Sequence, residues 1–336
     1  MWSPPSISIV IPVYNVEPYI ADCLQSVMRQ TYQGPMECIV VDDACTDKSM
    51  SIAKELIAGY DGPIVFKVLR HKNNRGLSAV RNTGTDAAAG DYLFYVDSDD
   101  YLSDDCIEVL ARPLHEKLYD MVVGNFTVFG EESNERFFVE QGGMYEGDRL
   151  RKVCFSQKVY KAAWNKLYNF SFLRHHNLAF FEGILLEDVL WNYCVVQCLS
   201  NLYVVKDDVT YHYRIRRQSI MGQIKENPEK KADSLYAIVK QIIGQEFVEN
   251  TGYEPERMAY INSYFLKYMM CDFGNKARMR ALYMYVRDHW DYSPMKLFRA
   301  GLMPASQVKK HLYYVLPPLL GWWYLYLKIW KNSRIK

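Results

Sequence analysis

The chain has 336 residues, of which 49% are hydrophobic and 24% charged, a balance typical of a folded globular protein and unlike that of a disordered one. Its 40 Lys and Arg residues almost balance its 39 Asp and Glu residues, which excludes the strong positive field of a general nucleic-acid-binding protein. The length suits one large domain or two modest ones.

The cysteines and the N-terminus indicate a reducing compartment. The eight cysteines contain no Cys-x-x-Cys pair and no regular disulfide framework. Residues 1–5 lack the charged and apolar regions of a signal peptide. We therefore expect a cytoplasmic chain that is not exported.

Apolar runs alternate with helical periodicity over the first hundred residues. The pattern predicts strands at residues 6–12, 37–41, 64–69 and 92–96. It predicts helices at about residues 20–30, 46–57 and 76–89. This alternation favours an α/β fold with a doubly wound, mainly parallel sheet. No Gly-x-Gly-x-x-Gly follows the first strand, so a dinucleotide site is not expected.

The remainder becomes mainly helical. A helix is expected at 104–117, a strand at 120–128, and a hairpin or loop at 131–147 with 136–140 extended. Further helices are predicted at 148–156, 187–199, 230–250, 255–273 and 276–288, with only 202–205 and 210–213 extended. The linker-like residues 225–230 suggest a sheet domain at 1–222 and a helical C-terminal extension at 223–336.

Three carboxylates follow the fourth strand. Asp97 and Asp99 lie two residues apart, and Asp100 comes next. Ligands of open α/β sheets bind at the carboxyl ends of the strands, and paired carboxylates suit Mg²⁺ or Mn²⁺. An isolated Asp-x-Asp is equally compatible with a solvated turn that caps the next helix.

The ends of the other strands strengthen the metal and nucleotide interpretation. Tyr14 and Asn15 follow the first strand, Asp42 and Asp43 end the second, and residues 75–84 place small residues at a helix start, where N–H groups favour anions. This combination resembles the family 2 glycosyltransferases with the GT-A fold. The resemblance covers roughly residues 6–221 and is carried by Ile-Pro-Val-Tyr-Asn (11–15), Val-Asp-Asp-Ala-Cys-Thr-Asp (41–47), Asn-Arg-Gly-Leu-Ser-Ala-Val-Arg-Asn (74–82), Asp-Ser-Asp-Asp (97–100), Trp-Asn-Lys-Leu-Tyr (164–168), Phe-Glu-Gly (181–183), Glu-Asp (187–188) and Tyr-Arg-Ile-Arg (213–216) with Ser-Ile (219–220). Ala44-Cys45 and Arg75 depart from the usual Gly-Ser and Gly.

The resemblance implies a UDP-sugar donor. Its nucleotide would be bound by Pro12, Tyr14, Asn15, Asp42, Arg81, Asn82, Asp97 and Ser98. Asp42 would accept the uracil N3–H, because an ionised carboxylate is only an acceptor. The alternative is that Asp42 caps the next helix, for which Asp47 is better placed. For Arg81 the alternative is an ordinary helix-surface arginine.

The resemblance also implies Mg²⁺ or Mn²⁺ on the diphosphate, bound by Asp99 and Asp97. His212 would be a further ligand, although an imidazole beside aromatic residues is more often packed. Arg214, Arg216 and Ser219, with Arg217, form a cationic segment that would close over the diphosphate.

Glu187-Asp188 would carry the chemistry. Transfer to a hydroxyl needs a general base, and the resemblance assigns that role to Asp188, with Glu187 orienting or binding the acceptor. A single base implies inversion at the anomeric carbon. The alternative is that both acids cap the helix that follows. Trp164, Asn165 and Lys166 are predicted on the acceptor side, although Trp164 is equally suited to a core.

The tail, about residues 313–336, combines Trp and Tyr with basic residues. Pro317-Pro318 leaves a segment of about twelve mostly apolar residues, short of the roughly 20 needed to cross a bilayer. Such a segment suits an interfacial helix on an anionic membrane. The alternative is packing on the helical extension or on a second subunit of a homodimer.

Together these patterns predict an inverting glycosyltransferase at the inner face of the cell membrane. It would move a sugar from a UDP-sugar to a growing polysaccharide or a lipid-linked glycan, and it would bind no nucleic acid. Two alternatives are a nucleotidyltransferase on a similar sheet and a non-catalytic sugar-nucleotide-binding scaffold.

Overall fold

The computed structural model describes residues 3–130, 141–216, 227–245, 253–290 and 293–333. The chain divides into two compact units. The first consists of residues 1–150, 157–183 and 187–219, and the second of residues 151–156, 184–186 and 220–336.

Four parallel strands form the first half of the sheet in the first unit. β1 (Ile7–Val13), β2 (Met36–Asp42), β3 (Val65–Arg70) and β4 (Tyr92–Tyr95) pair in the order β3-β2-β1-β4. The predicted strands are confirmed. Every residue of β1 is buried because β1 lies between β2 and β4 and has helices on both faces, as parallel strands require.

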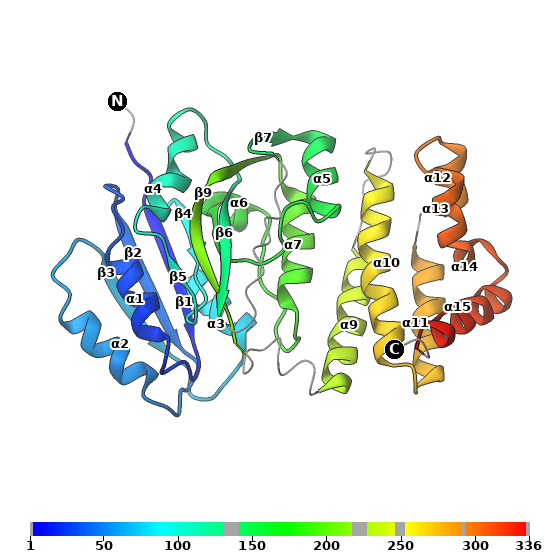
Figure 1. Cartoon of the computed structure of the whole chain (residues 1–336), viewed down its shortest axis with the longest axis horizontal. Coiled ribbons are helices and arrows are strands. Elements are labelled where there is room, and N and C mark those ends of the chain that lie inside the picture. The colour runs from blue at the N-terminus through cyan, green and yellow to red at the C-terminus, as the bar shows by residue number, and fades with distance from the viewer. Residues whose placement is uncertain (1–2, 131–140, 217–226, 246–252, 291–292, 334–336) are drawn as a thin grey trace. The chain divides into compact units, whose positions relative to one another are not determined.

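The connecting helices are α1 (Ile20–Met28), α2 (Ser49–Ala58) and α3 (Leu77–Asp86). Right-handed crossovers put α1 and α2 on one face of the sheet and α3 on the other, as Figure 1 shows. A Cβ at Gly84 would lie 2.3 Å from Val10 Cγ1. Glycine at this position therefore lets α3 pack closely on β1, and this contact fixes where the side chains of α3 project.

Beyond β4 the sheet becomes mixed. β8 (Lys166–Asn169) runs antiparallel to both β4 and β6 (Met121–Gly130). β9 (Asn201–Ile215) is parallel to β6, whereas β5 (Tyr101–Leu102) and β7 (Gly143–Glu146) pair with β9 in the antiparallel sense. In the order β3-β2-β1-β4-β8-β6-β9-β5, β8 and β6 lie between β4 and β9, and the carboxyl ends of β4 and β9 point to the same edge of the sheet.

Several of these strands differ from the sequence expectation. β5 and β8 were not predicted, and residues 202–205 and 210–213 belong to one strand of 15 residues, β9. The helix expected at 104–117 consists of α4 (Cys106–Ala111) and a 3₁₀ turn at Arg112–His115 that contains a proline. The expected extended segment 136–140 lies outside the described residues.

Two more helices lie in the first unit. α6 (Phe170–His175) follows β8, and α7 (Glu187–Cys198) begins with the acidic pair of the sequence analysis. α5 (Gly147–Phe155) spans the boundary between the two units.

The second unit is built from helices: α9 (Pro228–Ile243), α10 (Glu254–Cys271), α11 (Lys276–His289), α12 (Pro294–Arg299), α13 (Ala305–Lys310), α14 (Leu312–Val315) and α15 (Pro318–Ser333). Tyrosines fill much of its core. Tyr313 donates to Asn262 Oδ1 at 2.6 Å, and Tyr283 donates to the Tyr313 carbonyl at 2.7 Å. Within the described part of the chain, no helix is both long and apolar enough to cross a membrane.

Candidate active site

Arg81 is the centre of the site. Its side chain, on α3, is completely buried. One terminal nitrogen donates to Asp97 Oδ1 at 2.8 Å, and the other donates to Glu187 Oε1 at 2.9 Å and Asp188 Oδ1 at 2.8 Å. One guanidinium thus joins the acid after β4 to the two acids that begin α7. The surface role considered for Arg81 is excluded.

The pKa values of Glu187 and Asp188, two of the three carboxylates around Arg81, are raised. Burial raises the pKa of Glu187, and the neighbouring Asp188 raises it further. Burial also raises the pKa of Asp188, while Arg81 and the buried ammonium of Lys166 oppose that rise. A carboxylate with a raised pKa is a stronger proton acceptor when ionised.

The two acids of the pair differ in access. The side chain of Asp188 is 25% exposed, whereas that of Glu187 is 8% exposed. Asp188 is therefore the member of the pair that is more accessible to solvent. Glu187 accepts from the same Arg81 nitrogen as Asp188 does.

Two arginines hold Asp99 in the turn after β4: Arg214, which lies in β9, and Arg216, which follows its last residue. Arg216 Nε donates to Asp99 Oδ2 at 2.6 Å, and Arg214 Nε donates to the Asp99 carbonyl at 3.0 Å. Burial raises the pKa of Asp99, and nearby Asp97 adds to the rise although Arg216 opposes it. A divalent cation would relieve this repulsion, and two carboxylates are the hard oxygen donors that Mg²⁺ and Mn²⁺ prefer. Asp97 and Asp99 therefore fit such an ion.

Asp100 has a structural role. Its carboxylate accepts from Tyr211 Oη at 2.6 Å and from the Arg214 N–H at 2.7 Å, and it is 1% exposed. It fastens the turn after β4 to β9. Ser98 is also buried in this turn.

His212 is packed beside this turn. Its Nε2 lies 3.1 Å from Ser103 Oγ, and its ring stacks on Tyr101 with centroids 4.4 Å apart. Within the described residues, no group of three or more His, Cys, Asp or Glu side chains is arranged to hold a metal. These contacts match the packed imidazole that the sequence analysis gave as the alternative.

At the ends of β1 and β2, Pro12 pairs with Val41 and Tyr14 is 48% exposed. Asn15 adopts φ 49° and accepts from the Thr46 N–H at 2.9 Å. Asp42 accepts from the Cys45 N–H at 2.8 Å and lies 3.3 Å from Arg70 Nε. One oxygen of Asp42 therefore holds the loop before α2, close to the capping role considered for it.

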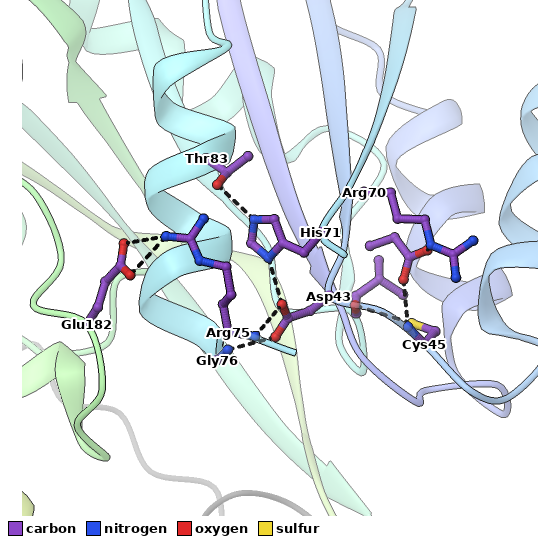
Figure 2. Close-up of polar contacts among 10 residues, drawn as sticks. Asp43, Cys45, Arg70, His71, Arg75, Gly76, Thr83 and Glu182 are labelled. Carbon is purple, nitrogen blue, oxygen red and sulfur yellow. Dashed lines mark hydrogen bonds and ion pairs between the residues drawn. The ribbon is translucent and has the colours of Figure 1, made fainter. Parts of the chain in front are cut away.

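Asp43 is a structural residue to which the sequence analysis gave no role (Figure 2). Its Oδ1 accepts from the Arg75 N–H and its Oδ2 from the Gly76 N–H, both at 2.8 Å. His71 Nδ1 lies 2.7 Å from Asp43 Oδ1, and His71 Nε2 lies 2.9 Å from Thr83 Oγ1 on α3. Asp43 and His71 therefore fix the start of α3, the helix that carries Arg81. In the sequence, the signal that could have identified Asp43 was its position in a pair of acids at the end of a predicted strand.

Asn82, also on α3, holds the segment that leads to α7. Its side chain donates to the Phe180 carbonyl at 2.9 Å and accepts from the Phe180 N–H at 2.8 Å. Arg75 forms an ion pair of 3.1 Å with Glu182, as Figure 2 shows. These contacts fasten residues 180–182 to α3.

The predicted acceptor-side residues lie in the core. Trp164 is 6% exposed and stacks on Tyr211, with ring centroids 4.5 Å apart. Asn165 is fully buried and accepts from Thr210 Oγ1 at 2.8 Å. Lys166 is 1% exposed, and its Nζ donates to the Tyr160 carbonyl at 2.8 Å. Direct contact of Asn165 and Lys166 with an acceptor does not fit this packing, because their polar groups are used to join strands and loops. Ser219 and Arg217, expected at the diphosphate, lie outside the described residues.

Comparisons with known proteins show the family of the chain. Residues 8–176 match the family model described as glycosyl transferase family 2. The chain is 33% identical over 238 residues to the putative glycosyltransferase EpsH of Bacillus subtilis, covering 69% of this chain and 67% of EpsH. It is 35% identical over 224 residues to the glycosyltransferase GlyA of Streptococcus pneumoniae, covering 64% of this chain and 31% of GlyA.

Solved structures show the same fold. Residues 1–349 of Staphylococcus aureus TarS, in complex with UDP-GlcNAc, align with a TM-score of 0.72 at 18% identity, over 98% of this chain and 91% of that one. The mannosyltransferase PcManGT of Pyrobaculum calidifontis, in complex with GDP-Man and Mn²⁺, aligns with a TM-score of 0.57 at 13% identity, over 99% of this chain and 87% of that one. The protein is a glycosyltransferase with the GT-A fold. It belongs to glycosyl transferase family 2.

Proposed function

We propose that this glycosyltransferase moves a sugar from a UDP-sugar to a hydroxyl of a polysaccharide or a lipid-linked glycan, with inversion, and that Asp188 is the general base. The observation that carries the proposal is the cluster of Asp97, Glu187 and Asp188 around buried Arg81. Within it, Asp188 is more exposed than Glu187 and its pKa is raised.

The proton transfer follows from these properties. The acceptor hydroxyl attacks the anomeric carbon while Asp188 takes its proton, and the bond from that carbon to the UDP oxygen breaks. Glu187, whose pKa is also raised, stays hydrogen-bonded to Arg81 and orients the acceptor. Displacement in line with the leaving group inverts the configuration, so an α-linked donor gives a β-linked product.

The donor assignment rests on the strand ends and on a relative. TarS of Staphylococcus aureus, which shares the fold, was solved with UDP-GlcNAc. By the family resemblance we place the nucleotide against Pro12, Tyr14, Asn15 and Asp42 at one end and against Arg81, Asn82, Asp97 and Ser98 at the other. Because Arg81 and Asn82 already hold protein groups, their contribution is to position the acids and residues 180–182.

Asp97 and Asp99 would hold Mg²⁺ or Mn²⁺, which when bound neutralises charge on the leaving diphosphate. The Mn²⁺ in the related mannosyltransferase complex supports a divalent metal in this fold. Arg214 and Arg216, which lie against Asp99, and Ser219 from the sequence would contribute further donors to the diphosphate.

We place the enzyme at the cytoplasmic face of the cell membrane, where lipid-linked acceptors are found, with a peripheral contact through residues 313–336. In this proposal the α/β domain, residues 1–222, carries the reaction, and the extension, residues 223–336, serves localisation. The arrangement of the catalytic acids entirely within the first unit is consistent with that division.

Asp188→Asn tests the base, with Glu187→Gln as the matched variant that removes the same charge from the same cluster. We expect Asp188→Asn to lower UDP release in the presence of donor and acceptor by about 10²–10⁴-fold. We expect Glu187→Gln to retain more activity. Both variants should keep stabilisation by UDP, measured as a shift in thermal unfolding.

Two results would contradict parts of the proposal. Wild-type turnover in Asp188→Asn would remove it as the base. Stabilisation by other nucleotides but not by UDP, in a panel tested with and without Mn²⁺, would overturn the donor assignment.

A further inference from the structure

Helix α15 has two apolar faces, and only one of them is covered. Trp322, Leu325 and Ile329 are buried in the second unit. A Cβ at Gly321 would lie 2.3 Å from the Tyr313 carbonyl oxygen, which shows how closely this face packs on α14. The other face carries large exposed side chains: Leu319 at 59%, Leu320 at 61%, Trp323 at 54%, Tyr324 at 39%, Leu327 at 56% and Trp330 at 38%.

The spacing of the exposed residues is helical. Leu320, Trp323 and Leu327 recur at intervals of three and four residues, so they form one stripe along the helix. Soluble proteins seldom leave a contiguous stripe of large apolar side chains exposed to water unless it contacts a partner.

The charges around this stripe are of one sign. Residues 292–336 contain eight Lys and Arg residues and no Asp or Glu, whereas the preceding 291 residues contain 32 basic and 39 acidic ones. In the described part of this segment, Lys296, Arg299, Lys309, Lys310 and Lys331 are exposed. The end of the chain is therefore strongly basic, although the whole chain is nearly neutral.

We propose that the exposed face of α15 binds the surface of an anionic lipid bilayer. Trp and Tyr side chains prefer the interface between water and acyl chains, Leu side chains insert below it, and nearby Lys and Arg residues attract anionic headgroups. The helix lies in the plane of the surface, because no helix of the described residues can span a bilayer.

Charge argues against a second copy of the chain as the occupant. A symmetric contact between two such faces would bring two basic segments together, and like charges across an interface oppose association. A lipid surface with phosphate headgroups satisfies both the apolar stripe and the basic residues. This inference rests on the proposed function and deepens it by naming the surface that the enzyme contacts.

The test is cosedimentation of the full chain with vesicles of phosphatidylcholine alone or with added phosphatidylglycerol. We expect binding to the anionic vesicles, weakened by salt, and little binding to the neutral ones. In the double variant Trp323→Gln and Leu327→Gln, the affinity for anionic vesicles should fall by about tenfold or more, because the inserted apolar groups are lost.

The matched control is Leu118→Gln with Met270→Gln. These residues are 62% and 47% exposed and lie outside α15, so the control makes the same kind of change elsewhere. It should bind vesicles as the wild type does. Both double variants should keep the wild-type thermal unfolding and its shift with UDP, which shows that the fold and donor site are intact.

Three outcomes would overturn the inference: no binding of the wild type to anionic vesicles, wild-type binding by the α15 variant, or an equal loss in the control. Light scattering tests the other possible occupant of this face, a second copy of the chain. A wild-type dimer that dissociates in the α15 variant would assign this face to a second copy instead. Because vesicle binding needs no substrate, failure of the transfer assay and failure of lipid binding are independent results.

Discussion

Replacing Arg81 by methionine tests the central element of the site. The guanidinium is fully buried and forms hydrogen bonds with three carboxylates at 2.8–2.9 Å. Methionine has a similar length but no charge, so the change leaves the acids buried with no cation at their centre. Removing one partner of a buried ion pair costs about 3–5 kcal/mol. That is a large part of the roughly 5–15 kcal/mol that stabilises a typical domain.

The loss should depend on pH, and its sign follows from linkage. Burial already raises the pKa of Glu187 and Asp188, and Arg81 opposes the rise. Without Arg81 the folded-state pKa of both carboxyls rises further above the unfolded value. The folded state then binds more protons than the unfolded state between these values, so the free energy of unfolding falls as pH rises through that window.

Urea unfolding of Arg81→Met and the wild type at about pH 5 and about pH 7.5 measures this effect. We expect the greater destabilisation at the higher pH, and partial recovery of stability there in the double variant Arg81→Met, Glu187→Gln, because one buried charge is removed. Arg81→Lys, which keeps the positive charge but replaces the planar set of guanidinium N–H donors by one ammonium, is the conservative control. An equal loss at both pH values and no recovery by Glu187→Gln would refute the electrostatic reasoning.

Three further predictions follow from other contacts. In Arg216→Gln, Asp99 loses the cation 2.6 Å from its Oδ2. Titration calorimetry should therefore show that the variant binds Mn²⁺ more tightly than the wild type in the absence of UDP. An unchanged affinity would show that Arg216 does not compete with a metal. Gly84→Ala places a Cβ 2.3 Å from Val10 Cγ1 and should lower the free energy of unfolding by about 1–3 kcal/mol, whereas Gly274→Ala, where a Cβ meets no atom within 4 Å, should have a smaller effect. The rate of transfer should fall on acidification at a pH above the usual range for an aspartate, because the pKa of Asp188 is raised; a pH profile of turnover that stays level down to the ordinary aspartate range would contradict its role as base.

The sequence determined the first half of the sheet and the residues at its edge. β1, β2 and β4 are runs of apolar residues bounded by polar ones, and such local patterns predict buried strands directly. Because parallel strands present their carboxyl ends at one edge, the placement of Asp42 and Asp97 near that edge followed from the order of the elements.

The second half of the sheet needed the tertiary structure. β8 has only four residues and contains Lys166, a charged residue that local patterns place outside a buried strand, although its ammonium is buried and donates to the carbonyl oxygen of Tyr160. β9 has three exposed charged or polar residues at 206–208 in its middle, so its local pattern suggests two short strands, and pairing with β6 and β7 makes it one.

The site itself combines both kinds of information. The acids were visible as local patterns, but Arg81 joins Asp97 to Glu187, which is 106 residues away from Arg81 in the sequence. The choice between a core and an acceptor-side role for Trp164 also depended on a ring from β9. Hydrophobic periodicity records which side of its own element a residue faces. Which distant charge or ring lies opposite is set by the packing of elements, and only the tertiary structure decides it.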